Sequence, residues 1–361
     1  MSRLANKRLG LIGNPENRRL QDFARARQQL GFPAPIILSY QQLLSDPTAL
    51  DRLQVDLLRI DSPGENESVA QGLIALGGGP ARAQPAFGQI GYLKEYHRGF
   101  CRLLEDMERR AIPCLNAPHE IALMFDKWAC HQRFVQHGLA RPPAQLAPAD
   151  FPALLEHMRE RGSGRLFFKP LHGSSASGVC ALRWMPQRQL LIAPLQIQSG
   201  GVLVNSLKVQ RYTQLAELEI ILGNLLPQGM IAEQWIPKLT LCQGAVDMRV
   251  LVVAGQARHR VVRQSRHPMT NLHLGNQRCD EDLVRQAIGP RFEEALRLAE
   301  RAAACFPQSL YAGVDILLDH GGRPLVGEIN AFGDLLPRLT HNGESAYTAI
   351  ARICDAASAV V

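Results

Sequence analysis

The sequence is poor in lysine and lacks the spacings by which cysteine builds metal sites and disulfide frameworks. Lysine accounts for six of the 40 basic residues, at positions 7, 94, 127, 169, 208 and 238. The eight cysteines contain no C-x-x-C pair, which argues against zinc and favours free thiols in a reducing cytoplasm. The longest apolar runs, such as residues 250–254, are too short to cross a bilayer, so we expect no membrane association.

Two nucleotide-binding motifs are also missing. No G-x-x-x-x-G-K-[ST] occurs and no G-x-G-x-x-G follows the first expected strand, which excludes a P-loop and a Rossmann fingerprint. The net charge of +7 comes mainly from dispersed arginines, with a denser strip over residues 249–266. This charge permits anionic ligands such as nucleotides and carboxylates. No basic run is interleaved with aromatics, so we expect no nucleic-acid partner.

The pattern of the chain changes near residue 165. Short apolar strands at 8–13, 34–39 and 55–60 alternate with helices at 16–30 and 40–44, which predicts a small parallel α/β domain over roughly residues 1–115. Further helices are expected at 92–110, 116–137 and 151–161. After residue 165, apolar strands alternate with glycine-rich turns, and helices are expected at 282–305 and 344–359. The fold class is therefore α/β followed by α+β.

The segment GVDILLDHGGRPLVGEIN predicts a β-hairpin that carries acids. Gly321-Gly322 is a strong two-residue turn signal, and with that turn His320 faces Arg323 and Asp315 faces Glu328. Alternation places Asn330 on the same face as Glu328. Oxygen ligands without histidine or cysteine suit Mg²⁺ or Mn²⁺. The alternative is a surface pair, but adjacent acids repel one another unless a cation is bound.

The segment FFKPLHGSSASGV delivers Lys169 beside a small-residue loop over residues 173–178. Small residues let backbone amides approach phosphate oxygens, and lysine supplies a point charge. By itself the loop is equally consistent with an ordinary flexible turn.

Two weaker features complete the set. Residues 231–236 form an apolar strand with Glu233 and Gln234 at its centre, where backbone groups can bind a purine edge between apolar neighbours, although a core strand is the simpler reading. Asp126 and Lys127 are expected midway along the 116–137 helix, where a solvated face is the simpler interpretation.

In this order the pieces resemble the ATP-grasp superfamily. The resemblance covers about residues 116–331 and is greatest to the branch of ribosomal-protein glutamate ligases and related peptide and amino-acid ligases. It rests on the helix with DK, the KP strand with its loop, the strand with Glu233, then D-x-R, and Asp with E-x-N on a hairpin. It implies an α/β domain at 1–115 and two α+β subdomains at 116–200 and 201–361 that enclose ATP.

The resemblance also implies roles for individual residues. ATP would be bound by Lys127, Lys169, Gly173, Ser174, Ser175, Gly178, Glu233, Gln234, Trp235, Ile236 and Asp247. The metal would be held by Asp315, Glu328 and Asn330. Arg249, Arg263 and Asn271 would lie near the phosphates and the reacting group.

The substrate side departs from the pattern of these ligases. Met269 stands where they usually have arginine, and AFGDLLPRLTHNG replaces their small residues and Pro-Gly after E-x-N. We therefore expect a different substrate pocket. Candidate lining residues are Arg59, at the end of a strand where α/β sheets present ligands, and Asp334, Arg338 and His341 after the metal strand.

The activity implied is an ATP- and Mg²⁺-dependent ligase that joins a carboxylate to an amine through an acyl phosphate, releasing ADP and phosphate. The substrates would be small molecules or peptides, and since dimers are common among these ligases the resemblance allows a homodimer. Phosphate transfer to another acceptor would use the same site. A nucleotide-binding regulatory or assembly protein without turnover is the alternative from another class, although the intact metal set speaks against it.

Overall fold

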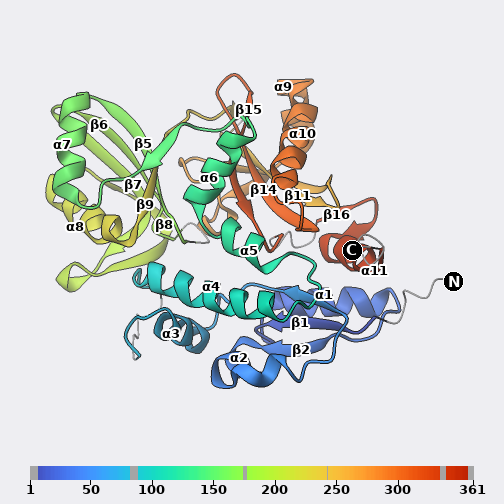
Figure 1. Ribbon diagram of the computed structural model, residues 1–361. Helices are drawn as coiled ribbons and strands as arrows, with labels where there is room; N and C mark the ends of the chain where they lie inside the picture. The colour runs from blue at the N-terminus through green and yellow to red at the C-terminus, as the bar shows by residue number, and fades with distance from the viewer. Residues whose placement is uncertain (1–6, 82–87, 174–176, 242, 334–338, 357–361) are drawn as a thin grey trace.

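A computed structural model describes residues 7–81, 88–173, 177–241, 243–333 and 339–356. Figure 1 shows a small N-terminal domain below two larger sheets, with the central sheet on the left and the C-terminal sheet on the right. Within the described ranges, no helix has both the length and the apolar character that a bilayer crossing requires. The predicted combination of α/β with α+β is confirmed.

The N-terminal domain is a parallel α/β unit, as predicted. Its three strands lie in the order β2-β1-β3 and all pair in parallel. The strands are β1 (Leu9–Gly13), β2 (Ile36–Ser39) and β3 (Leu57–Ile60). The helices are α1 (Arg18–Gln29), α2 (Tyr40–Ser45), η1 (Pro47–Leu50), α3 (Glu67–Leu76) and α4 (Leu93–Arg109). The sequence analysis did not anticipate α3.

The single helix expected over residues 116–137 is two helices. They are α5 (Pro118–Met124) and α6 (Lys127–Gln136). Asp126 separates them because its backbone is extended and its carboxylate accepts from the N–H groups of Trp128 and Ala129, both at 2.9 Å. Aspartate is a preferred N-cap, so the placement of Asp126 and Lys127 in mid-helix was wrong. Lys127 instead begins α6, and its N–H donates to Leu171 O.

The central sheet is antiparallel, with the order β4-β9-β5-β6-β7-β8. Its strands are β4 (Ala144–Leu146), β5 (Gly164–Pro170), β6 (Cys180–Met185), β7 (Arg188–Ile197), β8 (Leu203–Tyr212) and β9 (Met230–Gln234). Around it lie α7 (Phe151–Arg161), η2 (Ser199–Gly201), α8 (Leu215–Leu225) and η3 (Leu226–Gln228). The sheet takes strands from both sides of residue 200, and α7 and α8 close a separate apolar core over it.

The C-terminal sheet is also antiparallel, in the order β13-β12-β11-β14-β15 with β10 beside β11. Its strands are β10 (Thr240–Leu241), β11 (Gly244–Val253), β12 (Gln256–Ser265), β13 (Gln277–Cys279), β14 (Tyr311–Leu318) and β15 (Pro324–Asn330). The remaining elements are η4 (Leu272–Leu274), α9 (Glu281–Ile288), α10 (Arg291–Ala304), β16 (Thr340–His341), β17 (Glu344–Ser345) and α11 (Ala346–Ala356).

The helix expected over 282–305 is interrupted between α9 and α10. Gly289 has φ of +54°, which ends α9, and Pro290 follows it as the N-cap of α10. Because proline cannot donate to the preceding turn, a continuous helix across this pair is disfavoured.

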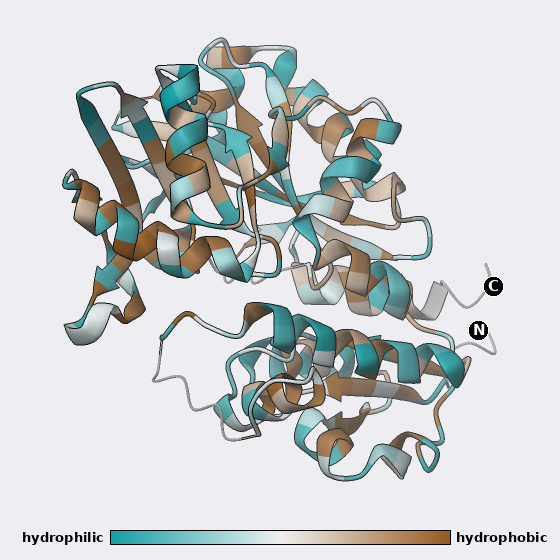
Figure 2. Ribbon diagram, turned by 60° about the vertical axis from the view of Figure 1, so that its left-hand side comes forward, coloured by the Kyte–Doolittle hydropathy of each residue, from teal (hydrophilic) through white to brown (hydrophobic). Residues whose placement is uncertain are grey.

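The N-terminal domain and the C-terminal sheet share their hydrophobic cores. One cluster joins Phe100 of α4 to Val250 and Val314 of the sheet. A second joins Phe23 of α1 to Ile350 of α11 and to β11. Figure 2 shows the hydrophobic residues concentrated along the sheet strands, with hydrophilic residues on the outer sides of the helices. These shared cores fix the N-terminal domain against the C-terminal sheet.

The β14–β15 hairpin reaches the predicted pairing of its acids by an unexpected route. Asp319 pairs with Arg323 through hydrogen bonds, so the loop comprises residues 320–322 and the predicted two-residue turn was wrong. Near the loop the register is shifted by one residue, with Leu318 opposite Pro324. A β-bulge at Gly327 then adds one residue to β15, and Asp315 lies opposite Glu328 as predicted.

Candidate active site

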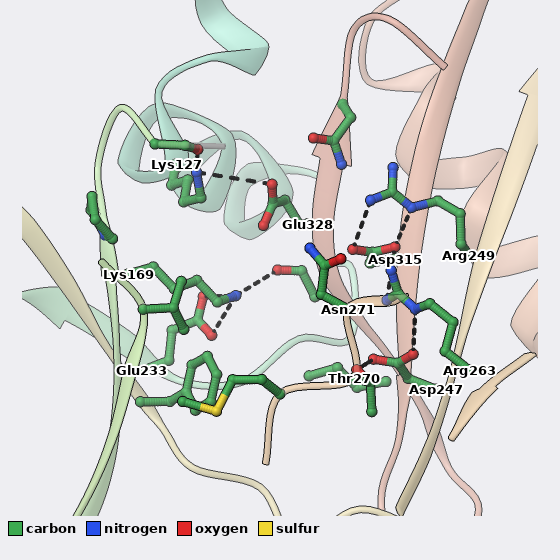
Figure 3. A pocket seen from close by; sticks show the side chains of 18 of the residues that line it. Lys127, Lys169, Glu233, Asp247, Arg249, Arg263, Thr270, Asn271, Asp315 and Glu328 are labelled. Carbon is green, nitrogen blue, oxygen red and sulfur yellow. Dashed lines mark hydrogen bonds and ion pairs between the residues drawn. The ribbon is translucent and has the colours of Figure 1, made fainter. Parts of the chain in front are cut away.

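A cavity between the central and C-terminal sheets collects most of the residues predicted for the site (Figure 3). Strands β5 and β9 form one wall, and β11, β12, β14 and β15 form the other. The predicted residues that line it are Lys127, Lys169, Gly173, Glu233, Gln234, Trp235, Ile236, Asp247, Arg249, Arg263, Asn271, Asp315, Glu328 and Asn330.

Two lysines line the cavity near the glycine-rich loop, which is the small-residue loop over residues 173–178. Lys127 Nζ donates to Gly173 O at 2.5 Å and lies 3.9 Å from Glu328 Oε1. Lys169 Nζ contacts Glu233 Oε2 at 2.8 Å and donates to Gly327 O at 3.0 Å. Burial alone would lower the pKa of Lys169, but the carboxylates of Glu233 and Glu328 raise it. Lys169 is therefore placed to meet anionic oxygens as a cation.

The acids of the hairpin face the cavity together with Asn330. Burial would raise the pKa of Glu328, but the lysines and arginines around it lower it, so this carboxylate is ionised. The Asn330 amide bridges Glu328 Oε1 and Arg249 Nη1, at 3.2 and 3.1 Å, when its nitrogen faces the acid. Two carboxylates and an amide oxygen form the oxygen-only set that Mg²⁺ prefers. The residues present therefore fit a hard divalent cation.

Asp315 is at present neutralised by two arginines. Arg249 Nε lies 2.5 Å from Asp315 Oδ1, and Arg263 Nη2 lies 3.1 Å from the same oxygen. Arg249 and Asp315 are directly opposite each other on β11 and β14. A cation bound at Asp315 would compete with these guanidiniums for the same carboxylate.

A buried polar network lies beneath the arginines. Asp247 Oδ1 accepts from Arg263 Nε at 2.8 Å, and its Oδ2 lies 3.1 Å from Lys238 Nζ. Burial would raise the pKa of Asp247, but Arg263 and Lys238 hold it well below its usual range. Thr270 donates to the same carboxylate. The sequence analysis missed Lys238 and Thr270, although the scarcity of lysine was a signal for Lys238.

One part of the cavity wall is apolar. Met269 is buried and packs in a cluster with Phe167, Val179 and Trp235, all of which line the cavity. Flat apolar walls of this kind suit an aromatic ring. The backbone N–H of Trp235 already donates to Arg165 O at 3.1 Å. This backbone group is therefore not available to bind a base. Met269, noted as a departure in the sequence, is thus a packing residue.

Several predicted residues lie elsewhere. Arg59 is fully buried, with its guanidinium 3.9 Å from the centre of the Phe23 ring, so it cannot meet a substrate. His341 packs against the His259 ring and does not line the cavity. Gly178, the last residue of the loop, has φ of +68°, a conformation that glycine adopts readily, and it does not line the cavity. Ser174, Ser175, Asp334 and Arg338 lie outside the described residues.

Two stacked histidines connect the N-terminal domain to the glycine-rich loop. The rings of His97 on α4 and His172, just before Gly173, are 3.7 Å apart and nearly parallel. Burial and the neighbouring imidazole lower the pKa of His172 to about 4, and burial lowers that of His97. Asp126 opposes these shifts and Lys127 adds to them. Both rings are therefore neutral at pH 7.

We expect acid to weaken this contact. Between about pH 6.5 and 4 the unfolded chain binds more protons at His172 than the folded chain, so stability falls as the pH falls. The contribution is on the order of 1–3 kcal/mol. The thermal midpoint should fall less from pH 7 to pH 5 in His172→Gln than in the wild type. His137→Gln, at an exposed histidine, is the matched control and should follow the wild type.

Comparison with known proteins finds one curated relative by sequence. No protein-family model matches the chain. The chain is 28% identical over 235 residues to a probable alpha-L-glutamate ligase of Parasynechococcus marenigrum, which covers 64% of this chain and 41% of that relative. It thus spans about two fifths of the length of the curated relative that it matches.

The fold of this chain matches solved structures over nearly its whole length. The D-cycloserine synthetase DcsG superposes with a TM-score of 0.57 at 15% identity, covering 96% of this chain and 98% of that one. A RimK domain ATP-grasp protein from Sphaerobacter thermophilus gives 0.54 at 13% identity, with the same coverage. The ATP-grasp ligase PsnB gives 0.53 at 14% identity, covering 99% and 100%. The chain has the ATP-grasp fold, as the resemblance of its motifs implied.

Proposed function

We propose that this protein is an ATP- and Mg²⁺-dependent ligase that joins a carboxylate to an amine and forms ADP and phosphate. The observation that carries the proposal is the meeting of two predicted sets of residues in one cavity. The lysines suited to phosphate and the oxygen ligands suited to a cation face each other, with Lys127 Nζ 3.9 Å from Glu328 Oε1. Mg·ATP would satisfy both sets at once.

The chemistry requires positioning and charge neutralisation. The bond between the β- and γ-phosphates of ATP breaks, and the γ-phosphoryl group is transferred to a carboxylate oxygen, giving an acyl phosphate and ADP. An amine then attacks the carbonyl carbon, loses a proton and displaces phosphate. Lys127, Lys169 and Arg263 would bind the phosphate oxygens, and Arg249 would stabilise the tetrahedral intermediate. Asp315, Glu328 and Asn330 would hold Mg²⁺, which when bound neutralises phosphate charge.

The rest of the cavity suits the nucleoside. The apolar cluster around Met269 and Trp235 would clamp the adenine ring, with Asp247 near the ribose. Related structures support both substrate classes, small molecules and peptides. DcsG is a D-cycloserine synthetase, whereas PsnB and the macrocyclase MdnC are each bound to a precursor peptide. PsnB is also seen with Mg and ADP.

The test is thermal unfolding with and without Mg·ATP, for the wild type and for Glu328→Ala. Nucleotide at about a hundred times its Kd should stabilise the wild type by roughly 2.7 kcal/mol. Glu328→Ala should reduce the magnesium-dependent part of the shift because it removes one metal ligand. Glu344→Ala, at an acid of β17 that does not line the cavity, is the control.

A panel of acids and amines then tests turnover. ADP release that needs both an acid and an amine supports a ligase. Nucleotide binding without release under any pair would support the non-catalytic alternative. No thermal shift at millimolar Mg·ATP in the folded wild type would contradict the proposal altogether.

A further inference from the structure

A short segment, residues 113–117, joins the N-terminal domain to the C-terminal sheet. On one side it bonds to β3, since the Leu115 N–H donates to Leu58 O at 2.8 Å. On the other side it bonds to the residue before β14, since the Leu310 N–H donates to Leu115 O at 2.8 Å. The segment therefore connects two parts of the chain that both line the cavity, the N-terminal domain through Arg19 and the C-terminal sheet through its hairpin.

The side chain of Asn116 is buried in this junction and bonds to two places in the hairpin at once. Its Nδ2 donates to Tyr311 O at 2.9 Å and to Ala331 O at 2.7 Å, and its Oδ1 accepts from the Tyr311 N–H at 3.3 Å. Tyr311 begins β14, and Ala331 directly follows β15. Both amide hydrogens and the amide oxygen are therefore used, and Asn116 is only 3% exposed.

Asn116 takes the place of a strand neighbour where the β14–β15 ladder ends. The last pair of that ladder is Gly313 with Asn330, so the pairing stops short of Tyr311. Both backbone groups of Tyr311 bond to the Asn116 side chain instead, which satisfies polar groups that burial would otherwise leave unpaired. Because the same amide also holds the carbonyl of Ala331, it fixes the end of β15 against the start of β14.

Asn116 does not cap the helix that follows it. Asparagine is a preferred N-cap residue, but the N-cap of α5 is Ala117, which makes no side-chain hydrogen bond. The side-chain bonds of Asn116 to the described residues go to Tyr311 and Ala331, which lie 195 and 215 positions away along the chain. The asparagine therefore serves the hairpin and not the start of α5.

The residue that Asn116 holds is next to a proposed metal ligand. Asn330 contributes the amide of the proposed set and immediately precedes Ala331. In the orientation described above, its side chain bridges Glu328 Oε1 and Arg249 Nη1 at 3.2 and 3.1 Å. The peptide bond between Asn330 and Ala331 is planar and stiff. A shift of the chain at Ala331 would therefore move Asn330 relative to the other ligands.

We propose that Asn116 is a positioning residue for the metal site, and that it acts by holding the end of β15, and with it Asn330, against β14. The inference rests on the proposed function, because it assigns Asn330 to the Mg²⁺ that accompanies ATP. Asn116 itself does not line the cavity. Its effect on the metal must therefore pass through the strand that it holds.

The test measures the affinity of the whole chain for a non-hydrolysable ATP analogue by isothermal titration calorimetry, in saturating Mg²⁺ and in EDTA. The ratio of the two dissociation constants is the gain in affinity due to the metal. In Asn116→Ala this gain should fall about tenfold, as is typical for residues that orient metal ligands. The affinity in EDTA should stay close to that of the wild type.

A double variant tests whether Asn116 acts through Asn330. Asn330→Ala should lose at least as much of the metal-dependent gain as Asn116→Ala. Adding Asn116→Ala to Asn330→Ala should then cause no further loss, because the effects of residues that act through one another are not additive.

Ser309→Ala is the matched control, because it removes another hydrogen bond at the same junction. Ser309 Oγ donates to Glu120 Oε2 at 2.6 Å, Glu120 is 1% exposed, and neither residue lines the cavity. Both single variants should lower the thermal midpoint, but Ser309→Ala should keep the full metal-dependent gain. If Asn116→Ala does not fold, Asn116→Ser replaces it, since a hydroxyl has one hydrogen and cannot donate to both carbonyls.

Three results would each overturn the inference. They are an unchanged gain in the folded Asn116 variant, an equal loss of the gain in Ser309→Ala, and fully additive losses in the double variant. Failure of the proposed function appears separately, as a wild type whose affinity for the analogue does not depend on Mg²⁺, and that result would overturn both.

Discussion

Replacing Lys169 with methionine is expected to abolish the stabilisation of the protein by Mg·ATP and to destabilise the free protein by about 3–5 kcal/mol. The first effect follows because the lysine is a buried cation on the cavity wall. The second follows because the variant leaves Glu233, whose side chain is 11% exposed, as a buried acid without its partner. Thermal unfolding with and without nucleotide measures both effects.

A double variant separates stability from binding. Lys169→Met with Glu233→Gln removes both charges, so most of the stability should return while the nucleotide shift remains absent. Lys208→Met, at an exposed lysine of β8, should behave as the wild type. If the double variant regained a full Mg·ATP shift, Lys169 would have no direct role in binding nucleotide.

The second large effect is expected at Arg263. Its guanidinium joins two acids, with Nε 2.8 Å from Asp247 and Nη2 3.1 Å from Asp315. A lysine keeps the charge but cannot hold both carboxylates in this geometry. Arg263→Lys should therefore lower kcat by on the order of 10²–10³, the loss typical when a donor to developing negative charge is removed.

The measurement is steady-state ADP release with the acid and amine pair that the panel identifies. Arg266→Lys, three residues along and exposed, is the control and should retain the wild-type rate. A kcat within threefold of the wild type for Arg263→Lys would show that the arginine supports the fold alone.

Sequence reasoning located the parts of the site that depend on neighbours along the chain. Asp315, Glu328 and Asn330 belong to one hairpin, whose strand pairing is local and therefore readable from alternation. Lys169 and its loop were readable for the same reason, since a strand and its turn carry their own signal. The order of these pieces then defined the fold.

The contacts that it missed join distant segments. Arg19 reaches the cavity only because the N-terminal domain shares its cores with the C-terminal sheet, and no local pattern encodes that docking. The role of Lys238 depends on Asp247 of β11 and on Thr270 in the loop before η4. The helix break at Asp126 was missed because aspartate also occurs on solvated helix faces, and only the cap geometry distinguishes the two.

The bulge at Gly327 has a consequence for how relatives of this protein are compared. It lies between the hairpin loop and the paired acids, and its carbonyl accepts from Lys169. The pairing next to the loop would by itself place Asp315 opposite Gly327, and the extra residue at the bulge brings Glu328 there instead. An alignment anchored on the turn of a relative that lacks this bulge would therefore shift the acids by one position.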